Sequence, residues 1–210
     1  MKLIGMLDSP YVRRVAVSLQ FLGVPFEHEA VSVFRHYDKF VGINPAVKAP
    51  TLICDDGGIL MDSTLILDYA ERLSGRTLMP SALAERQRAL YLIGMALAAV
   101  EKSIQHYYEH ELRPEEKRHA PWVERVTGQL HRALRALEDA VTRSPLEAGR
   151  ERIDQAGITL ATVWSFMQGI HPSLVPAAHY PAIAAFAAKC EALPEFRRAP
   201  HGFGTYPVAA

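Results

Sequence analysis

Three short motifs in the first third of the chain place polar side chains where a small ligand could bind. The first is Ser9-Pro10, at the point where a short apolar strand passes into a helix. A side chain there lies in the positive field of a helix N-terminus, beside unpaired backbone N–H groups, and such surroundings stabilise a thiolate. The alternative is that Ser9 only caps the helix, as a lone serine in this place usually does.

The second motif is Lys48-Ala49-Pro50, directly before a predicted strand. A proline at such a strand start is a candidate for a cis peptide bond, which would present the backbone of Ala49 outward. An extended peptide could then pair with that backbone at the edge of the sheet. The alternative is an ordinary loop proline, because most X–Pro bonds are trans.

The third motif is Asp62-Ser63, at the start of a predicted helix. Ser63 and the N–H groups of the helix N-terminus could hold a ligand carboxylate, while Asp62 could pair with a ligand amine. Helix capping is the simpler explanation when the pair is considered alone.

The local pattern of residues 1–76 predicts the element order β-α-β-(α)-β-β-α around these motifs. Strands are expected at Lys2–Met6, Phe26–Val33, Thr51–Cys54 and Ile59–Met61. Helices are expected from Pro10 to a C-cap at Gly23 and from Ser63 to Gly75, while Phe34–Ile43 is either a short helix or an irregular loop.

Both predicted helices have one apolar side. In the first helix the apolar positions recur at helical spacing, at Val12, Val15, Leu19 and Leu22. The polar residues on its other side are Arg13, Arg14 and Gln20. In the second helix the expected apolar face comprises Ile66, Tyr69, Ala70 and Leu73.

After a linker over Arg76–Ala82 the apolar period is helical throughout, which predicts an all-helical domain over residues 83–210. Pro114 and Pro121 separate two long helices, and a shorter helix is expected near Pro181–Leu193. Ile158–Met167 is apolar on nearly all sides, so its helix should be central and buried.

In this order and at this spacing, the motifs resemble the N-terminal domain of the cytosolic glutathione S-transferases, in particular bacterial members with Ser at the active-site position. The resemblance is carried by Ser9-Pro10-Tyr11-Val12-Arg13-Arg14-Val15, Gly23-Val24-Pro25-Phe26-Glu27, Asn44-Pro45, Lys48-Ala49-Pro50-Thr51-Leu52, and Asp62-Ser63 ahead of Ile66 and Tyr69. It implies a thioredoxin-like α/β domain over residues 1–76 and an all-α helical-bundle domain over 83–210.

The resemblance implies a role for each motif residue. Ser9 would donate a hydrogen bond to the glutathione sulfur and favour its thiolate. Ala49 would pair through its backbone with the cysteinyl part of glutathione, ahead of cis-Pro50. Asp62 and Ser63 would hold the γ-glutamyl amine and carboxylate, and Lys48 would reach the glycine carboxylate.

The implied activity is conjugation of the glutathione thiolate to a small hydrophobic electrophile, with glutathione as co-substrate and no metal. The resemblance also implies a homodimer and a helix-capping box at Thr159, with Thr162 in place of the usual acid. The electrophile pocket is expected between the two domains, formed by Leu7, Tyr107, Tyr108 and Trp164, with Phe203 or Tyr206 as further members.

Two other readings stay open. A glutathione-dependent isomerase, dehalogenase or peroxidase would use the same thiolate on a different second substrate. A non-catalytic, transferase-like binding or assembly module would have lost the glutathione site. If Ser9 is not the thiolate's partner, Tyr11 or a backbone N–H is the next candidate. The turn carries no Cys-x-x-Cys, which argues against dithiol–disulfide exchange.

Composition excludes several other classes of protein. Acidic and basic residues are equal in number, at 23 each, so neither nucleic acid nor an acidic membrane surface is an expected partner. No apolar run is long enough for a membrane span, and Lys2–Leu7 is too short for a signal peptide. Cys54 and Cys190 suggest no disulfide framework, so the expected compartment is the cytoplasm.

His106 and His110 lie one helical turn apart but have no evident third ligand for a metal.

Overall fold

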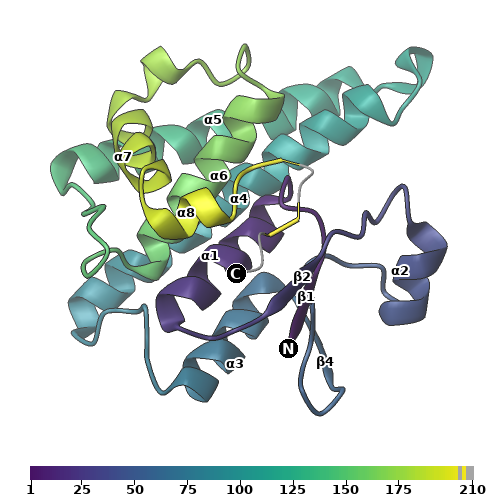
Figure 1. Ribbon diagram of the computed structural model, residues 1–210. Coiled ribbons are helices and arrows are strands. Elements are labelled where there is room, and N and C mark those ends of the chain that lie inside the picture. The colour runs from purple at the N-terminus through teal and green to yellow at the C-terminus, as the bar shows by residue number, and fades with distance from the viewer. Residues whose placement is uncertain (203–204, 207–210) are drawn as a thin grey trace. The chain divides into compact units, whose positions relative to one another are not determined.

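A four-stranded mixed sheet with the order β2-β1-β3-β4 organises the first part of the chain (Figure 1). The computed structural model describes residues 1–202, 205 and 206. β1 and β2 are parallel, and α1 makes the crossover between them that parallel strands require. The elements are β1 (Lys2–Ile4), α1 (Pro10–Leu22), β2 (Glu27–Glu29), α2 (Tyr37–Ile43), β3 (Thr51–Ile53), β4 (Ile59–Met61) and α3 (Ser63–Ser74).

The predicted element order is therefore confirmed, and the open segment Phe34–Ile43 contains the helix α2. The predicted strand at Phe26–Val33 is much shorter in the structure, covering only Glu27–Glu29. Its three residues are all charged or imidazole-bearing, so their β propensity is low and pairing with β1 is what keeps them extended.

The two faces of the sheet are covered by different helices. Ile4 of β1 packs with Val31 and with Phe40 of α2 in one cluster of buried side chains. Figure 1 shows α1 and α3 together on the other side of the sheet. Successive residues of a strand point to opposite faces, so Leu3, which is fully buried, belongs to the α1 side.

The polar side predicted for α1 is wrong, because Arg13 and Arg14 are both buried. Helix α1 is covered on nearly all sides, and each guanidinium is hydrogen-bonded to a segment that is remote in the sequence. Local periodicity cannot reveal such partners.

Arg13 holds the C-terminal segment against α1. Its guanidinium forms a bidentate ion pair with Glu191, with both N–O distances 2.6 Å. It also donates to the backbone oxygens of Ala199, at 2.7 Å, and Phe196, at 3.4 Å. The charge also lies 5.6 Å from the centre of the Phe196 ring. A buried charge is tolerated when it is paired and hydrogen-bonded in this way.

His28 forms a second link to the C-terminal segment. Its Nδ1 accepts a hydrogen bond from the Tyr206 N–H at 2.7 Å, and its Nε2 donates to the Gly5 carbonyl at 2.7 Å. Burial lowers the pKa of His28, so the neutral ring that these two bonds require is favoured. The Tyr206 ring stacks at a tilt on Phe26, with centroids 4.8 Å apart.

These links explain how the chain divides. One compact unit comprises Met1–Met79 together with the chain from Glu191 onward, and the other comprises Pro80–Cys190. The expectation from the sequence placed everything after residue 83 in the helical domain. The structure groups the last part with the sheet instead, including helix α8 (Pro194–Arg198).

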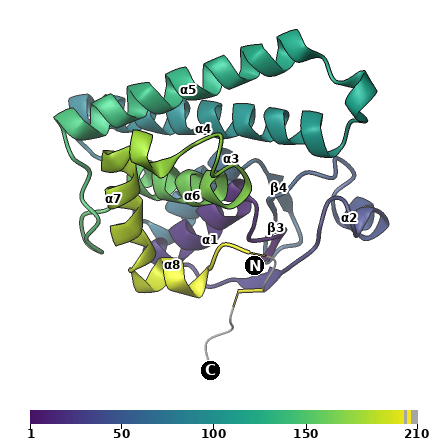
Figure 2. The ribbon, with the colours of Figure 1, turned by 90° about the horizontal axis from the view of Figure 1, so that it is seen from above.

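The second unit is all-helical. Figure 2 shows its two long helices, α4 and α5, running side by side. Helix α6 packs on α4 and is buried along most of its length, as its apolar sequence predicts. The elements are α4 (Leu83–Glu111), η1 (Glu115–Lys117), α5 (Ala120–Arg143), α6 (Gln155–Ile170), η2 (Ala177–His179) and α7 (Pro181–Glu191).

The cap of α6 is not at Thr159. The N-cap is Asp154, whose carboxylate accepts the Gly157 N–H at 2.8 Å. Thr159 lies one turn inside the helix, and its hydroxyl donates to the Gln155 carbonyl at 2.7 Å. The helix begins earlier than its apolar run because Gln155, Ala156 and Gly157 add a further turn.

Several large apolar side chains remain exposed on α3 and α4. Tyr69 and Leu73 were expected on the buried face of α3 but are 36% and 53% exposed, and Leu67 is buried in their place. Leu65 is 64% exposed on the same helix. Among residues 1–202, 205 and 206, no helix is long and apolar enough to cross a membrane.

Replacing Arg13 tests the link between α1 and the C-terminal segment. Arg13→Ala leaves the Glu191 carboxylate without its counter-charge and should cost about 3 kcal/mol in the free energy of unfolding. We take this low end because the Glu191 side chain is 35% exposed. Urea unfolding measures the loss, and Arg197→Ala, an exposed arginine of α8, is the matched control. Equal small losses in both variants would show that the buried ion pair does not hold this segment.

Candidate active site

The candidate site lies at one edge of the sheet. Because β3 runs antiparallel to both β1 and β4, the ends of β1 and β4 and the start of β3 share this edge. Helices α1 and α3 begin shortly after β1 and β4, so their N-termini are also here. The edge thus carries all six residues expected to bind the ligand, namely Ser9, Lys48, Ala49, Pro50, Asp62 and Ser63.

Gly5 allows these segments to approach one another. It follows β1 with φ 137°, and a Cβ there would lie 2.6 Å from Val12 of α1 and 3.1 Å from the Cβ of Ala49. Any larger residue would push α1 or the Ala49-Pro50 loop away from the end of β1.

Ser9 is the N-cap of α1. Its backbone is extended, and its Oγ accepts the Val12 N–H at the long distance of 3.4 Å. Because this oxygen acts as acceptor within the chain, its own proton can be donated to a ligand. The hydroxyl is half-buried, at the positive end of a 13-residue helix.

The Ala49-Pro50 peptide bond is cis, as the sequence suggested. The loop before it is held by the buried Asn44, whose side-chain amide donates to Thr51 Oγ1 at 2.8 Å. Its side-chain oxygen accepts the Ala46 N–H at 2.9 Å. In the sequence Asn44 stands out only as part of the Asn44-Pro45 motif, and its role in holding this loop depends on contacts that the structure supplies.

Asp62 has an unusual backbone conformation, with φ 71° and ψ 124°. Non-glycine residues rarely adopt positive φ, and such residues cluster at functional sites. The Asp62 carboxylate accepts the Thr64 N–H at 2.9 Å and lies 3.6 Å from the Lys48 ammonium. Both side chains are about half exposed, so this ion pair is weak and either group can turn to a ligand.

The buried Arg14 is hydrogen-bonded to the first residues of α3. Its guanidinium donates to Ser63 Oγ and Thr64 Oγ1, each at 3.1 Å. Burial lowers the pKa of Arg14 to about 10, an effect partly offset by Asp62, so the group stays charged at neutral pH. The positive charge strengthens the anion-binding character of this helix N-terminus. The sequence analysis had placed Arg14 on a polar surface.

Comparison with known proteins identifies the family to which the chain belongs. Residues 3–77 match the family model for the glutathione S-transferase N-terminal domain. A glutathione transferase family member from Pseudomonas fluorescens, solved with bound glutathione, is 30% identical, with a TM-score of 0.80 over 93% of this chain and 96% of that one. The chain belongs to the cytosolic glutathione S-transferase superfamily.

Two further relatives differ in how much of the chain the similarity covers. Glutathione S-transferase U4 of Arabidopsis thaliana is 30% identical over 91 residues, which is 43% of this chain and 41% of the plant protein. The match therefore spans less than half of that protein. A bacterial Zeta-class maleyl pyruvate isomerase is 24% identical with a TM-score of 0.76, covering 95% of this chain and 96% of its own, and shares the fold.

An acid, Asp8, directly precedes Ser9 in the chain. Burial raises the pKa of Asp8, while the charges of His201 and Arg35 lower it. His201 has a pKa lowered by burial and by Arg13. Next to the predicted catalytic serine there is thus a titratable pair, formed by Asp8 in the turn before α1 and His201 in the C-terminal segment.

The residues expected to contact the electrophile differ in exposure. Leu7 is fully buried and Trp164 is 5% exposed. Tyr107 is half-buried, with its ring 5.8 Å from that of His171, and Tyr108 is 41% exposed. The two tyrosines are therefore the members that a second substrate can reach. Phe203 lies outside the described residues, and Tyr206 binds His28 as set out above.

The histidines of α4 form a stack rather than a metal site. The rings of His106 and His110 are 4.2 Å apart, and His171 meets His106 edge-on at 4.9 Å. Burial, followed by the charges of its neighbours, lowers the pKa of His106 to about 4. In the part of the chain that the structure describes, no group of three ligating side chains could hold a metal.

Proposed function

We propose that this protein conjugates the thiolate of reduced glutathione to a small hydrophobic electrophile. The observation that carries the proposal is the convergence of Ser9, the cis Ala49-Pro50 bond and Asp62-Ser63 at one sheet edge. Membership of the superfamily and the glutathione-bound relative from Pseudomonas fluorescens support it.

The charges of the edge complement those of glutathione. The γ-glutamyl carboxylate would bind Ser63 and the N–H groups at the start of α3, and the γ-glutamyl amine would pair with Asp62. The backbone of Ala49 would hydrogen-bond the cysteinyl part as a short added strand. Lys48, which is more than half exposed, would pair with the glycine carboxylate.

Ser9 is then the residue that touches the reacting atom. Its O–H would donate to the glutathione sulfur, and the α1 N-terminus would add its positive field. Each unit by which the thiol pKa falls is worth about 1.4 kcal/mol and raises the thiolate fraction about tenfold. The thiolate attacks the electrophile directly, so the protein forms no covalent intermediate.

The second substrate would bind at the residues predicted for the electrophile pocket, of which Tyr107 and Tyr108 are more exposed than Leu7 and Trp164. An isomerase, dehalogenase or peroxidase would use the same activated thiolate, so only the second substrate separates these reactions from conjugation. A non-catalytic module would lack glutathione binding. We place the protein in the cytoplasm, where the buried thiols of Cys54 and Cys190 would stay reduced.

We also propose that the protein is a homodimer. Large apolar side chains are exposed on α3, at Leu65 and Leu73, and on α4, at Leu90 and Tyr91. Each is between 51% and 64% exposed, and apolar surface of this kind marks a protein interface.

The first experiment is calorimetric titration with reduced glutathione, combined with the ultraviolet absorbance of the bound thiolate. Ser9→Ala should leave the affinity nearly unchanged, raise the pKa of the bound thiol and lower turnover about tenfold or more. Ser9→Thr keeps the hydroxyl and is the matched control. An unchanged turnover in Ser9→Ala together with a loss in Tyr11→Phe would move the role to Tyr11. Absence of glutathione binding by the wild type would overturn the proposed function.

Arg14 is proposed as a positioning residue for γ-glutamyl recognition. Arg14→Met should weaken glutathione binding about tenfold but leave cysteinylglycine, which lacks the γ-glutamyl group, nearly unaffected. Arg14→Lys should recover part of the preference because it restores the charge. If folded Arg14→Met, checked by circular dichroism, keeps the wild-type preference for glutathione, Arg14 has only a structural role.

Sedimentation equilibrium tests the dimer. The wild type should show twice the chain mass of 23.3 kDa. Leu65→Glu and Leu90→Glu place charges in the apolar surfaces of α3 and α4 and should give monomers. Leu112→Glu, at a residue 57% exposed just beyond α4, is the control and should remain dimeric. A monomeric wild type would refute the proposal.

A further inference from the structure

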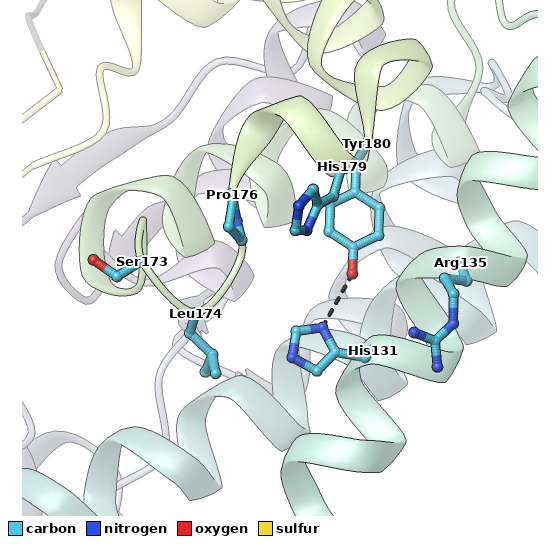
Figure 3. A pocket seen from close by; sticks show the side chains of 7 residues that line it. All are labelled: His131, Arg135, Ser173, Leu174, Pro176, His179 and Tyr180. Carbon is cyan, nitrogen blue, oxygen red and sulfur yellow. Dashed lines mark hydrogen bonds between the residues drawn. The ribbon is translucent and has the colours of Figure 1, made fainter.

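A cavity of about 480 Å³ lies within the helical unit, and its lining includes none of the residues assigned to glutathione or to the electrophile. Its size is in the range of small-molecule sites. Figure 3 shows that α5 forms one wall and the segment between α6 and α7 the other. The lining residues are His131, Arg135, Ser173, Leu174, Pro176, His179 and Tyr180.

The polar lining is cationic. Arg135 follows His131 by one turn of α5, so the two side chains lie on the same side of the helix. Figure 3 shows the His131 ring between Leu174 and Arg135, with the His179 ring on the opposite wall. None of the seven lining residues is acidic.

Packing fixes Tyr180 and orients His131, whereas Arg135 and His179 are exposed at the rim of the cavity. Tyr180 is 3% exposed, and its hydroxyl is hydrogen-bonded to His131 Nδ1 at 3.0 Å. The Tyr180 ring is packed edge-on against Trp164, with centroids 6.0 Å apart. The hydrogen bond from the buried Tyr180 thereby orients the His131 ring, and the ring's Nε2 is left for another partner.

An acid of α5, Glu138, is hydrogen-bonded outside the cavity lining. Glu138, on α5, accepts the N–H groups of Ala182 and Ile183 at the start of α7, at 2.7 and 3.0 Å. Its charge is balanced by that helix N-terminus. The exposed Arg135 guanidinium lines the cavity and has no ion pair with any of the described residues, so it can turn to a ligand there.

We propose that this pocket binds a small organic anion, whose carboxylate or phosphate group contacts Arg135 and His131. A guanidinium can bind either group through two parallel hydrogen bonds. Leu174, Pro176 and the Tyr180 ring supply an apolar wall for the body of the ligand. The inference is independent of the proposed transferase reaction, because the pocket uses none of its residues.

Binding should depend on pH. Burial lowers the pKa of His131, and the positive charges of Arg135 and His179 lower it further. His106 of α4 also interacts with His131, while Glu138 lies close to Tyr180. A bound anion offsets the repulsion among the cations and raises the pKa of His131. Affinity should therefore increase as the pH falls from about 8 to about 5.5, where imidazoles gain a proton.

The test follows the histidine ring resonances of the full chain by NMR during titration. The probes are benzoate, phenyl phosphate and neutral benzyl alcohol. Benzoate, phenyl phosphate or both should shift the His131 and His179 signals and raise the pKa of His131. Binding of only one anion identifies the head group. Benzyl alcohol should produce no comparable shift.

Arg135→Gln should weaken anion binding about tenfold, the effect of losing one charged hydrogen-bonding partner. Arg132→Gln, at an exposed arginine of the same helix outside the cavity, is the matched control. The proposal is overturned if neither anion shifts the two histidines, if benzyl alcohol shifts them equally, or if both variants lose affinity alike.

Discussion

Two adjacent guanidinium groups of α1 are buried and have to be ion-paired or hydrogen-bonded, because an unsatisfied buried charge costs several kcal/mol. Arg13 is ion-paired with Glu191 and hydrogen-bonded to the backbone of the C-terminal segment, while Arg14 is hydrogen-bonded to the hydroxyls at the start of α3 and stabilised by the charge of Asp62. Helix α1 is thereby fixed on two sides. Ser9, its N-cap, takes its place at the sheet edge from this same helix, so the position of the proposed catalytic group depends on both arginines.

Much of the first unit could be predicted from the sequence because its signals are local. The Asp-Gly turn between β3 and β4, the glycines that end α1 and α3, and the short apolar runs each act within a few residues. The order of the motifs Ser9-Pro10, Ala49-Pro50 and Asp62-Ser63 then indicated a thioredoxin-like domain that contains all three. The burial of Arg13 and Arg14 could not be predicted, because their partners lie 178 and 49 residues away.

The contrast between local signals and long-range contacts also distinguishes the candidate active site from the proposed anion pocket. The candidate active site is built from strand ends and helix starts, which leave capping and turn residues in the sequence. The anion pocket combines two residues of α5 with an irregular segment more than thirty residues later, where nothing periodic marks a contact. Asn44 and Asp154 show the intermediate case, since each is a recognisable capping or turn residue whose actual partner only the structure supplies.

The contact of Glu191 with Arg13 also bears on how the protein is made. A chain leaves the ribosome from its N-terminus, and domains usually fold as they emerge. Here the strands of the sheet unit are synthesised before the helical unit, but they lack the counter-charge of Arg13 and the Tyr206 partner of His28 until residues 191–206 have been translated. The helical unit, which ends at Cys190, can therefore fold before the contacts of the sheet unit are complete.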